Sequence, residues 1–226
     1  MENQVKKNGN EKRKESCKKV GAEKKQKGHK REKDFLEKYN PLELDKPIEY
    51  GATSDTRICS THPICNKLNE KIEPSNINVT NKSGNNIQLT LGNIPELKDI
   101  DVNQLNNNDG NCVRDIFNKY LKKNMSSKPA GILAYKDTIN KKWIFFNTDD
   151  IVNYIVDKCK WRKLETGRIK GDFIDHSKKG FSQYITYEYR ETHKGYFLGF
   201  NGGKGIKFIN LLKHQEHGIR YFEDDY

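Results

Sequence analysis

The chain has 226 residues and carries 42 Lys or Arg against 31 Asp or Glu, a formal net charge of +11. A positive excess of this size favours an anionic partner such as nucleic acid. No apolar run reaches the roughly 18 residues of a membrane span, and the first residues lack the apolar centre of a secretory signal. We therefore expect no membrane partner and an intracellular protein, in the cytoplasm, the nucleus or a virus factory.

The first 34 residues hold most of this charge, with 13 Lys or Arg, 6 Asp or Glu and a net charge of +7. They contain almost no large apolar side chains, so burial cannot offset the entropy lost on ordering. This composition predicts that residues 1–28 form a disordered basic tail. The tail is interpreted as a phosphate-binding arm or a nuclear-address-like cluster, or alternatively as a solvated segment that aids solubility.

Residues 29–226 are expected to form a single folded domain. Its first half begins with a short helix that carries Phe35, Leu36 and Tyr39 and stops at Pro41. Strands are predicted at 56–59, 77–80 and 87–91, with a helical turn in HPICNKLNEKI after the first of them. The sequence NKSGNN between the last two strands predicts that these pair as a hairpin.

The second half alternates between helical and strand patterns. Residues 101–111 are expected to form a loop, followed by an amphipathic helix at 111–124. GILAYK and KWIFFN are predicted as paired strands, and Thr148 as the cap of a helix that runs through Trp161. QYITYEYRET and GYFLGF follow as strands, and IKFINLLKH as the last helix. This order indicates an α/β or α+β fold with one mixed central sheet flanked by helices.

Four polar residues in the first half follow an order that is relevant to phosphodiester hydrolysis. Asp55 precedes a strand, Lys82 lies at the expected hairpin, Gln88 lies on the following strand and Glu37 lies on the first helix. Hard oxygen ligands hold divalent metal ions, and a nearby Lys stabilises developing charge. This order resembles that of the PD-(D/E)xK nuclease superfamily, which includes the type II restriction endonucleases.

The resemblance implies a Mg²⁺-dependent endonuclease that hydrolyses double-stranded DNA, often as a homodimer. It divides the domain into a catalytic half (29–100) and a recognition half (101–226). Asp55 would be the main metal ligand, Gln88 would support metal or water, Lys82 would stabilise the transition state and Glu37 would be an outer ligand. The family has an acid two residues before its Lys, where this chain has Thr80.

In the recognition half, basic residues alternate with aromatic ones between residues 161 and 207. Lys and Arg pair with phosphates, and Arg also reads guanine in the major groove of DNA. The candidate nucleic-acid-binding residues are Arg162, Arg168, Lys170, Arg190, Lys194 and Lys204.

Other interpretations stay open. The chain could be a non-enzymatic DNA- or RNA-binding protein, which the Thr80 departure favours, or a partner-binding protein whose tail binds RNA nonspecifically. Cys59, His62 and Cys65 have the spacing of half a zinc site. A His-metal or HNH-type nuclease is a further alternative, although the Asn-His pattern is missing; its candidates are His176, His193, His214 and His217. The five cysteines are expected to be free thiols.

Overall fold

The computed structural model describes residues 2–43, 56–68, 76–84, 87–92, 100–107, 111–121, 130–173, 184–190, 195–200, 204–214 and 218–226. The chain divides into two compact units, Met1–Lys46 and Pro47–Tyr226.

The first unit is one long helix, α1 (Glu2–Tyr39), followed by a 3₁₀ turn, η1 (Pro41–Glu43). The structure has a helix over residues for which the composition predicts a disordered tail. Lys and Glu are good helix formers and no proline interrupts the segment, so local propensity favours a helix there. Ion pairs one turn apart add support, as between Lys33 Nζ and Glu37 Oε1 at 3.9 Å.

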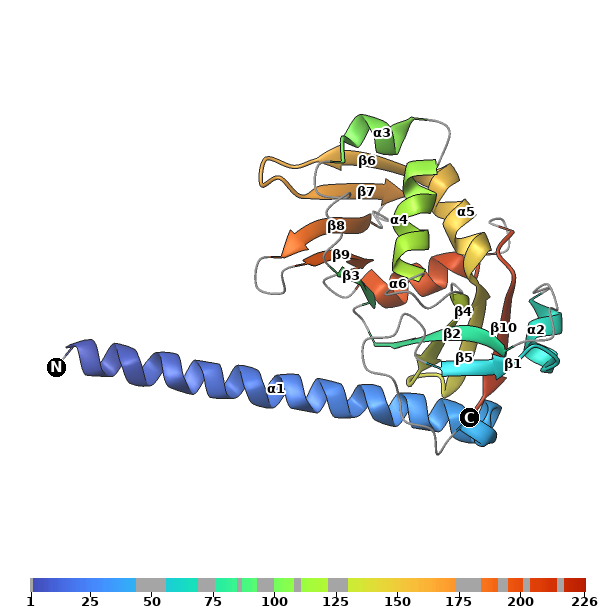
Figure 1. The fold of residues 1–226 in the computed structure, drawn as a ribbon, viewed down its shortest axis with the longest axis horizontal. Coiled ribbons are helices and arrows are strands. Elements are labelled where there is room, and N and C mark those ends of the chain that lie inside the picture. Colours follow the sequence, from blue (N-terminus) through green and yellow to red (C-terminus); the bar gives the residue numbers. More distant parts are fainter. Residues whose placement is uncertain are drawn as a thin grey trace. The chain divides into compact units, whose positions relative to one another are not determined.

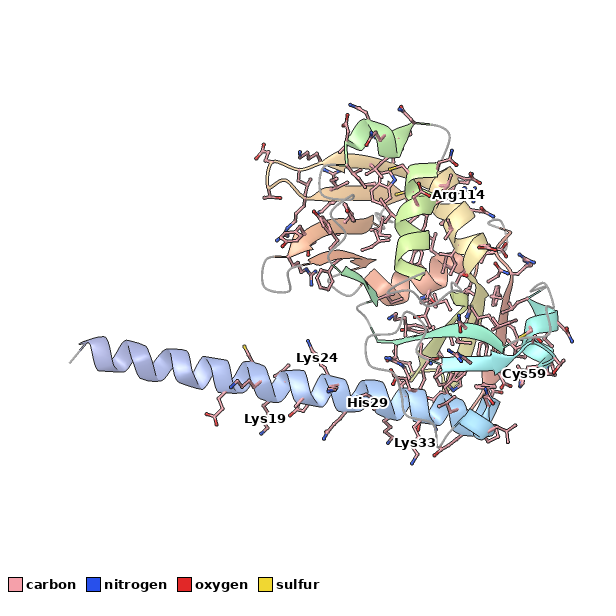
Figure 2. All side chains as sticks on the ribbon, viewed as in Figure 1. Lys19, Lys24, His29, Lys33, Cys59 and Arg114 are labelled. Carbon is pink, nitrogen blue, oxygen red and sulfur yellow. The ribbon has the colours of Figure 1, made fainter. Side chains whose placement is uncertain are left out.

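Charge surrounds α1 instead of following one face. Lys19 and Lys24 lie on opposite sides of the helix in Figure 2, and the described side chains from 15 to 27 are exposed. Near the end of α1 the rings of Phe35 and Tyr39 lie 5.0 Å apart, one turn from each other. The predicted short apolar helix that ends before Pro41 is thus confirmed as the last turns of a longer helix.

The second unit contains two five-stranded sheets (Figure 1). Sheet A has the order β1-β2-β4-β5-β10, and sheet B has the order β3-β9-β8-β7-β6. The strands of sheet A are β1 (Thr56–Cys59), β2 (Asn76–Ser83), β4 (Ala130–Asp137), β5 (Lys142–Asn147) and β10 (Tyr221–Asp225). The strands of sheet B are β3 (Ile87–Gly92), β6 (Cys159–Lys163), β7 (Ile169–Phe173), β8 (Tyr184–Arg190) and β9 (Gly195–Phe200).

The mixed α and β class is confirmed, with two sheets in place of one central sheet. Sheet A is mixed because β2 and β4 run parallel, whereas sheet B is antiparallel in every pair. The helices of this unit are α2 (Pro63–Lys67), α3 (Val102–Asn106), α4 (Asn111–Leu121), α5 (Thr148–Lys158) and α6 (Lys204–Leu212). Among the described residues, no helix combines the length and the apolar character that crossing a membrane requires.

One buried cluster joins both sheets to the helices. Leu133 and Phe146 from sheet A share it with Tyr187 and Leu198 from sheet B. Ile155 of α5 belongs to the same cluster. The helix α5 contacts β4, β5 and β6, so it packs on strands of both sheets. The core therefore fixes sheet B against the rest of the second unit.

The hairpin predicted for residues 77–91 does not form. The strand β2 pairs with β1 and β4 in sheet A, whereas β3 pairs with β9 in sheet B. A turn-forming sequence such as NKSGNN reports that the chain changes direction, but it does not select the partner of either strand. The burial of distant residues makes that choice.

Three local predictions also need correction. Residues 101–111 contain the helix α3, because Asp101 and Gln104 form a capping box. The cap of α5 is Asn147, whose side chain accepts a hydrogen bond from Asp150 N at 3.1 Å, and Thr148 is the first helical residue. The helix α5 ends at Lys158, since the residues that follow alternate between buried and exposed as β6. The predicted strand pairs β4–β5 and β8–β9 and the helices α4 and α6 are confirmed.

Candidate nucleic-acid interface

The face of sheet B that points away from the core carries most of the predicted nucleic-acid-binding residues. Arg162 lies opposite Lys170, and Lys170 lies opposite Thr186, so these residues of β6, β7 and β8 share one face. Arg190 is on the same face, because it follows Thr186 by four positions on β8. We call this the basic face; its described charged residues are Lys160, Arg162, Arg168, Lys170, Asp172, Glu188 and Arg190.

The opposite face of β6 and β7 anchors these strands in the core. Trp161, Ile169 and Phe173 are buried there, and Gly171 lies directly opposite Trp161. The strand period of two therefore separates an apolar side from a basic side. The β6–β7 hairpin is therefore amphipathic.

Two acids hold the arginines of the basic face in place. Asp172 Oδ2 accepts from Arg162 Nε at 2.6 Å, and this bond raises the pKa of Arg162. Glu188 accepts from Arg168 Nε at 3.0 Å through one oxygen and from Arg190 Nε through the other. The guanidinium carbon of Arg190 also lies 4.6 Å from the centre of the Phe197 ring. Each arginine is thus oriented by its neighbours.

This arrangement suits the binding of an anion. A guanidinium has five N–H donors, and each of the three acid contacts engages the single donor on Nε. The terminal nitrogens are the ones that form paired hydrogen bonds with a phosphate or a guanine edge. Five basic residues and two acidic ones leave the face with a net charge of +3. The side chains of Arg162 and Arg168 are 56% and 62% exposed, which makes them accessible to a large ligand.

The turn between β6 and β7 is a tight hairpin. Leu164 N donates to Arg168 O at 2.8 Å, and Gly167 N donates to Leu164 O at 2.9 Å. Gly167 has φ 78°, a left-handed conformation that glycine adopts without a steric cost. The turn therefore fixes the register that places Arg162 opposite Lys170.

The structure brings together four of the six predicted nucleic-acid-binding residues. Arg162, Arg168, Lys170 and Arg190 share the basic face, whereas Lys194 lies outside the described residues. Lys204 begins α6, and only its backbone is described. The sequence prediction missed Lys160 and both acids that orient the arginines. The alternation of buried and exposed residues in β6 was the signal for Lys160, but this segment was interpreted as the end of a helix.

The four residues of the predicted catalytic constellation are distributed over different parts of the fold. Lys82 lies on β2 in sheet A, whereas Gln88 lies on β3 in sheet B, where it pairs with Gly199 and only its backbone is described. Glu37 lies on α1 in the first unit, and Asp55 lies outside the described residues. The described residues thus contain no assembled set of these four.

One contact does connect two parts of that constellation. Thr56, which follows Asp55 in the chain, pairs with Val79 of β2. Its hydroxyl accepts a hydrogen bond from Asn81 Nδ2 at 2.8 Å, and both side chains are buried. The start of β1 therefore lies beside the strand that carries Lys82.

The described residues offer no ready ligand set for the Mg²⁺ that the resemblance implies. Within that part of the chain, no three His, Cys, Asp or Glu side chains gather closely enough to hold a metal ion. We therefore derive no catalytic step through a metal. Of the four histidines weighed for a His-metal site, three (His176, His193 and His217) lie outside the described residues.

The three residues with zinc-like spacing form a structural turn. His62 caps α2 by accepting a hydrogen bond from Ile64 N on Nδ1, and the buried Cys65 thiol donates to Cys59 O at 3.4 Å. Partial burial lowers the pKa of His62. The exposed Cys59 thiol hydrogen bonds to Thr61, which lowers the pKa of Cys59.

Comparison of the chain with protein-family models, with curated proteins and with solved structures finds no significant match.

Proposed function

We propose that the protein binds nucleic acid through the basic face of sheet B. The observation that carries this proposal is that Arg162, Lys170 and Arg190 share one face of three neighbouring strands and that Arg168, in the turn before β7, pairs with Glu188 of the same face. Lys and Arg that neutralise phosphates release counterions, which supplies most of the affinity of such proteins for nucleic acid. The acids on this face reduce its net charge but orient the guanidinium groups that would contact the ligand.

The helix α1 supplies a second basic surface for the same ligand. Its charge surrounds the helix, so it does not define a single contact face. Interactions of this kind are long-range and depend strongly on salt. We therefore assign orientation of the nucleic acid to sheet B and a nonspecific contribution to α1.

The proposal is tested by removing the two most exposed arginines of the basic face. The double variant Arg162→Ala/Arg168→Ala should bind a 30-bp DNA duplex more weakly than the wild type. Each phosphate contact contributes about 0.9 to the slope of log K against log salt, so losing two should make that slope shallower by about 2. Fluorescence anisotropy at several salt concentrations measures both quantities.

The matched control is Arg57→Ala/Lys158→Ala, which removes the same charge from exposed positions on β1 and α5. It should change the slope much less than the basic-face variant does. Equal effects of the two double variants would show that net charge alone decides binding, and the proposed interface would then be wrong.

As a second candidate function, we propose metal-dependent hydrolysis of duplex DNA, which the resemblance to PD-(D/E)xK nucleases implies. The observation in its favour is the pairing of Thr56 with Val79, which brings the residue after Asp55 beside the strand of Lys82. Incubation with supercoiled plasmid, with and without Mg²⁺, tests it directly. We expect cutting only with Mg²⁺, and loss of cutting with retained binding in Asp55→Asn and Lys82→Ala. Undiminished cutting by both variants, or none by the wild type, would eliminate this function.

A further inference from the structure

Sheet B presents a continuous surface, because β7 is hydrogen-bonded to β6 on one side and to β8 on the other. The helix α3 borders β6, where Asn106 bonds to the main chain of Trp161. Five strands about 4.8 Å apart make a face about 19 Å across, whereas the major groove of B-form DNA is about 12 Å wide. A face this broad does not enter that groove. The flat sides of the bases are stacked inside a duplex, so such a surface reaches them only where a strand is unpaired.

An aromatic ring lies on the basic face beneath one of its arginines. Phe197 of β9 pairs directly with Glu188 of β8, so its side chain points to the same side of the sheet as Glu188 and Arg190. The guanidinium carbon of Arg190 lies over this ring, 4.6 Å from its centre, in a cation–π contact. The ring is buried, whereas 26% of the Arg190 side chain is exposed. The guanidinium of Arg190, supported by the ring, is therefore the part of this pair that a ligand can reach.

Glu188 fixes this guanidinium from a second direction. Its carboxylate accepts from Arg190 Nε through Oε1 and from Arg168 Nε through Oε2, and its side chain is only 9% exposed. A buried carboxylate between two arginines holds both guanidinium groups in place before a ligand arrives. Arg190 is thus held by a ring and a carboxylate together, which favours contact through the flat side of its guanidinium as well as through its terminal N–H donors.

We propose that the basic face binds an unpaired strand of nucleic acid and that one of its bases stacks on the guanidinium of Arg190. This inference rests on the proposed nucleic-acid-binding function and specifies the form of its ligand. A planar guanidinium that lies on a ring has a second side, and the bases of single strands stack on such planes. Arg162 and Lys170, on the neighbouring strands β6 and β7, supply positive charge for the phosphates of the same strand.

Stacking of this kind has a consequence that charge does not have. Every base has a flat side, so the contact tolerates any sequence, but it requires that a base be present and unpaired. A strand without bases keeps the phosphates and loses the stacking. A duplex also keeps its phosphates, with its bases stacked on one another. Comparison with these two ligands therefore separates stacking from electrostatic attraction.

The experiment uses the full chain and four fluorescein-labelled probes. They are a 16-nucleotide DNA strand of mixed sequence, the same strand with every base replaced by an abasic site, the DNA duplex, and an RNA strand of the same sequence. In anisotropy titrations the wild type should bind the base-bearing DNA strand about 5- to 100-fold more tightly than the abasic strand.

Arg190→Lys keeps the charge but loses the planar guanidinium. Its affinity for the base-bearing strand should fall to near that for the abasic strand, whereas its affinities for the abasic strand and the duplex should not change. Phe197→Leu keeps an apolar side chain but removes the ring beneath the guanidinium, so it should lower the affinity for the base-bearing strand in the same direction. The control Arg57→Lys makes the same exchange on β1 and should keep the wild-type ratio. Circular dichroism shows whether each variant is folded; if Arg190→Lys is not, Phe197→Leu provides the test.

The RNA strand identifies the sugar. Phosphates and base faces are common to both strands, so RNA should respond to Arg190→Lys as DNA does. A response by one strand alone supports the inference for that ligand.

If the wild type binds none of the four probes, the proposed function itself fails. If it binds the strands with and without bases equally well, nucleic-acid binding stands and stacking on the basic face is overturned. The inference is also overturned if folded Arg190→Lys keeps the full preference for the base-bearing strand, or if it loses affinity for the duplex to the same extent.

Discussion

Replacing Gly171 by alanine tests how the amphipathic hairpin is built. Gly171 is buried in the middle of β7 and faces the core directly opposite Trp161. A Cβ at this position would overlap Cys159 Sγ and would lie 2.9 Å from Ile185 Cγ2 and 3.0 Å from Trp161 Cε3. All three neighbours are buried, so they have little room to move. The space that the glycine leaves is therefore filled by its neighbours.

Overpacking of this kind destabilises a core by about 1–3 kcal/mol. For a unit of this size, each kcal/mol lowers the melting temperature by roughly 2–4 °C. We expect Gly171→Ala to lower the free energy of unfolding by an amount in that range, measured by urea titration and thermal unfolding followed by circular dichroism. A shift below about 0.5 kcal/mol would contradict the close packing described for β6 and β7.

A double-variant cycle identifies the neighbour that causes the cost. Burial raises the pKa of the Cys159 thiol, which keeps it neutral, so Cys159→Ala should cost only packing, on the order of 1 kcal/mol. In Gly171→Ala/Cys159→Ala the new Cβ occupies the space of the lost sulfur. The double variant should therefore be more stable than the sum of the two single costs predicts, by at least about 0.5 kcal/mol. Strictly additive costs would refute the assignment of the overlap to Cys159.

Three further outcomes follow from other contacts. At the edge of sheet B, Asn106 donates to Trp161 O at 2.7 Å and accepts from Trp161 N at 2.8 Å. Asn106→Ala should therefore destabilise the second unit by about 1–3 kcal/mol in urea titration, and Asn106→Asp should not restore the lost stability. Hydrogen bonds, above all the one from Lys213, lower the pKa of Glu223 below its ordinary 4.5. The stability that this contact contributes is present above that pH and is lost as the pH falls below it. Glu223→Gln should reduce this loss of stability in acid titrations. Deleting residues 2–27, which removes ten Lys or Arg, should make the salt dependence of DNA binding shallower.

Local patterns in the sequence predicted the elements whose hydrophobic period was regular. The helix α4 has apolar residues at helical spacing, and β4, β5, β8 and β9 alternate or run apolar over enough residues to be recognised. The location of the positive charge was also readable, because counting residues needs no structure. The disorder predicted for the first 28 residues rests on low apolar content, which argues against a packed core but does not exclude the helix α1.

The sequence alone did not predict which strands pair with one another. The strand β2 joins β4 in one sheet and β3 joins β9 in another, although only a short turn-forming segment separates β2 from β3. Each choice depends on side chains that are distant in sequence and bury together. The predicted Lys82 and Gln88 therefore lie on different sheets, even though six positions separate them in the chain.

For the basic face, too, sequence and tertiary structure decide different properties. The sequence by itself determined that residues 161–207 are rich in basic and aromatic side chains. Only the tertiary structure decided which of them meet, because the register of β6, β7 and β8 places Arg162, Lys170 and Arg190 on one side. It also decided their partners, since Glu188 reaches Arg168 across the sheet and not along the chain. Composition is a local property of the chain, whereas a shared face depends on how separate strands pair.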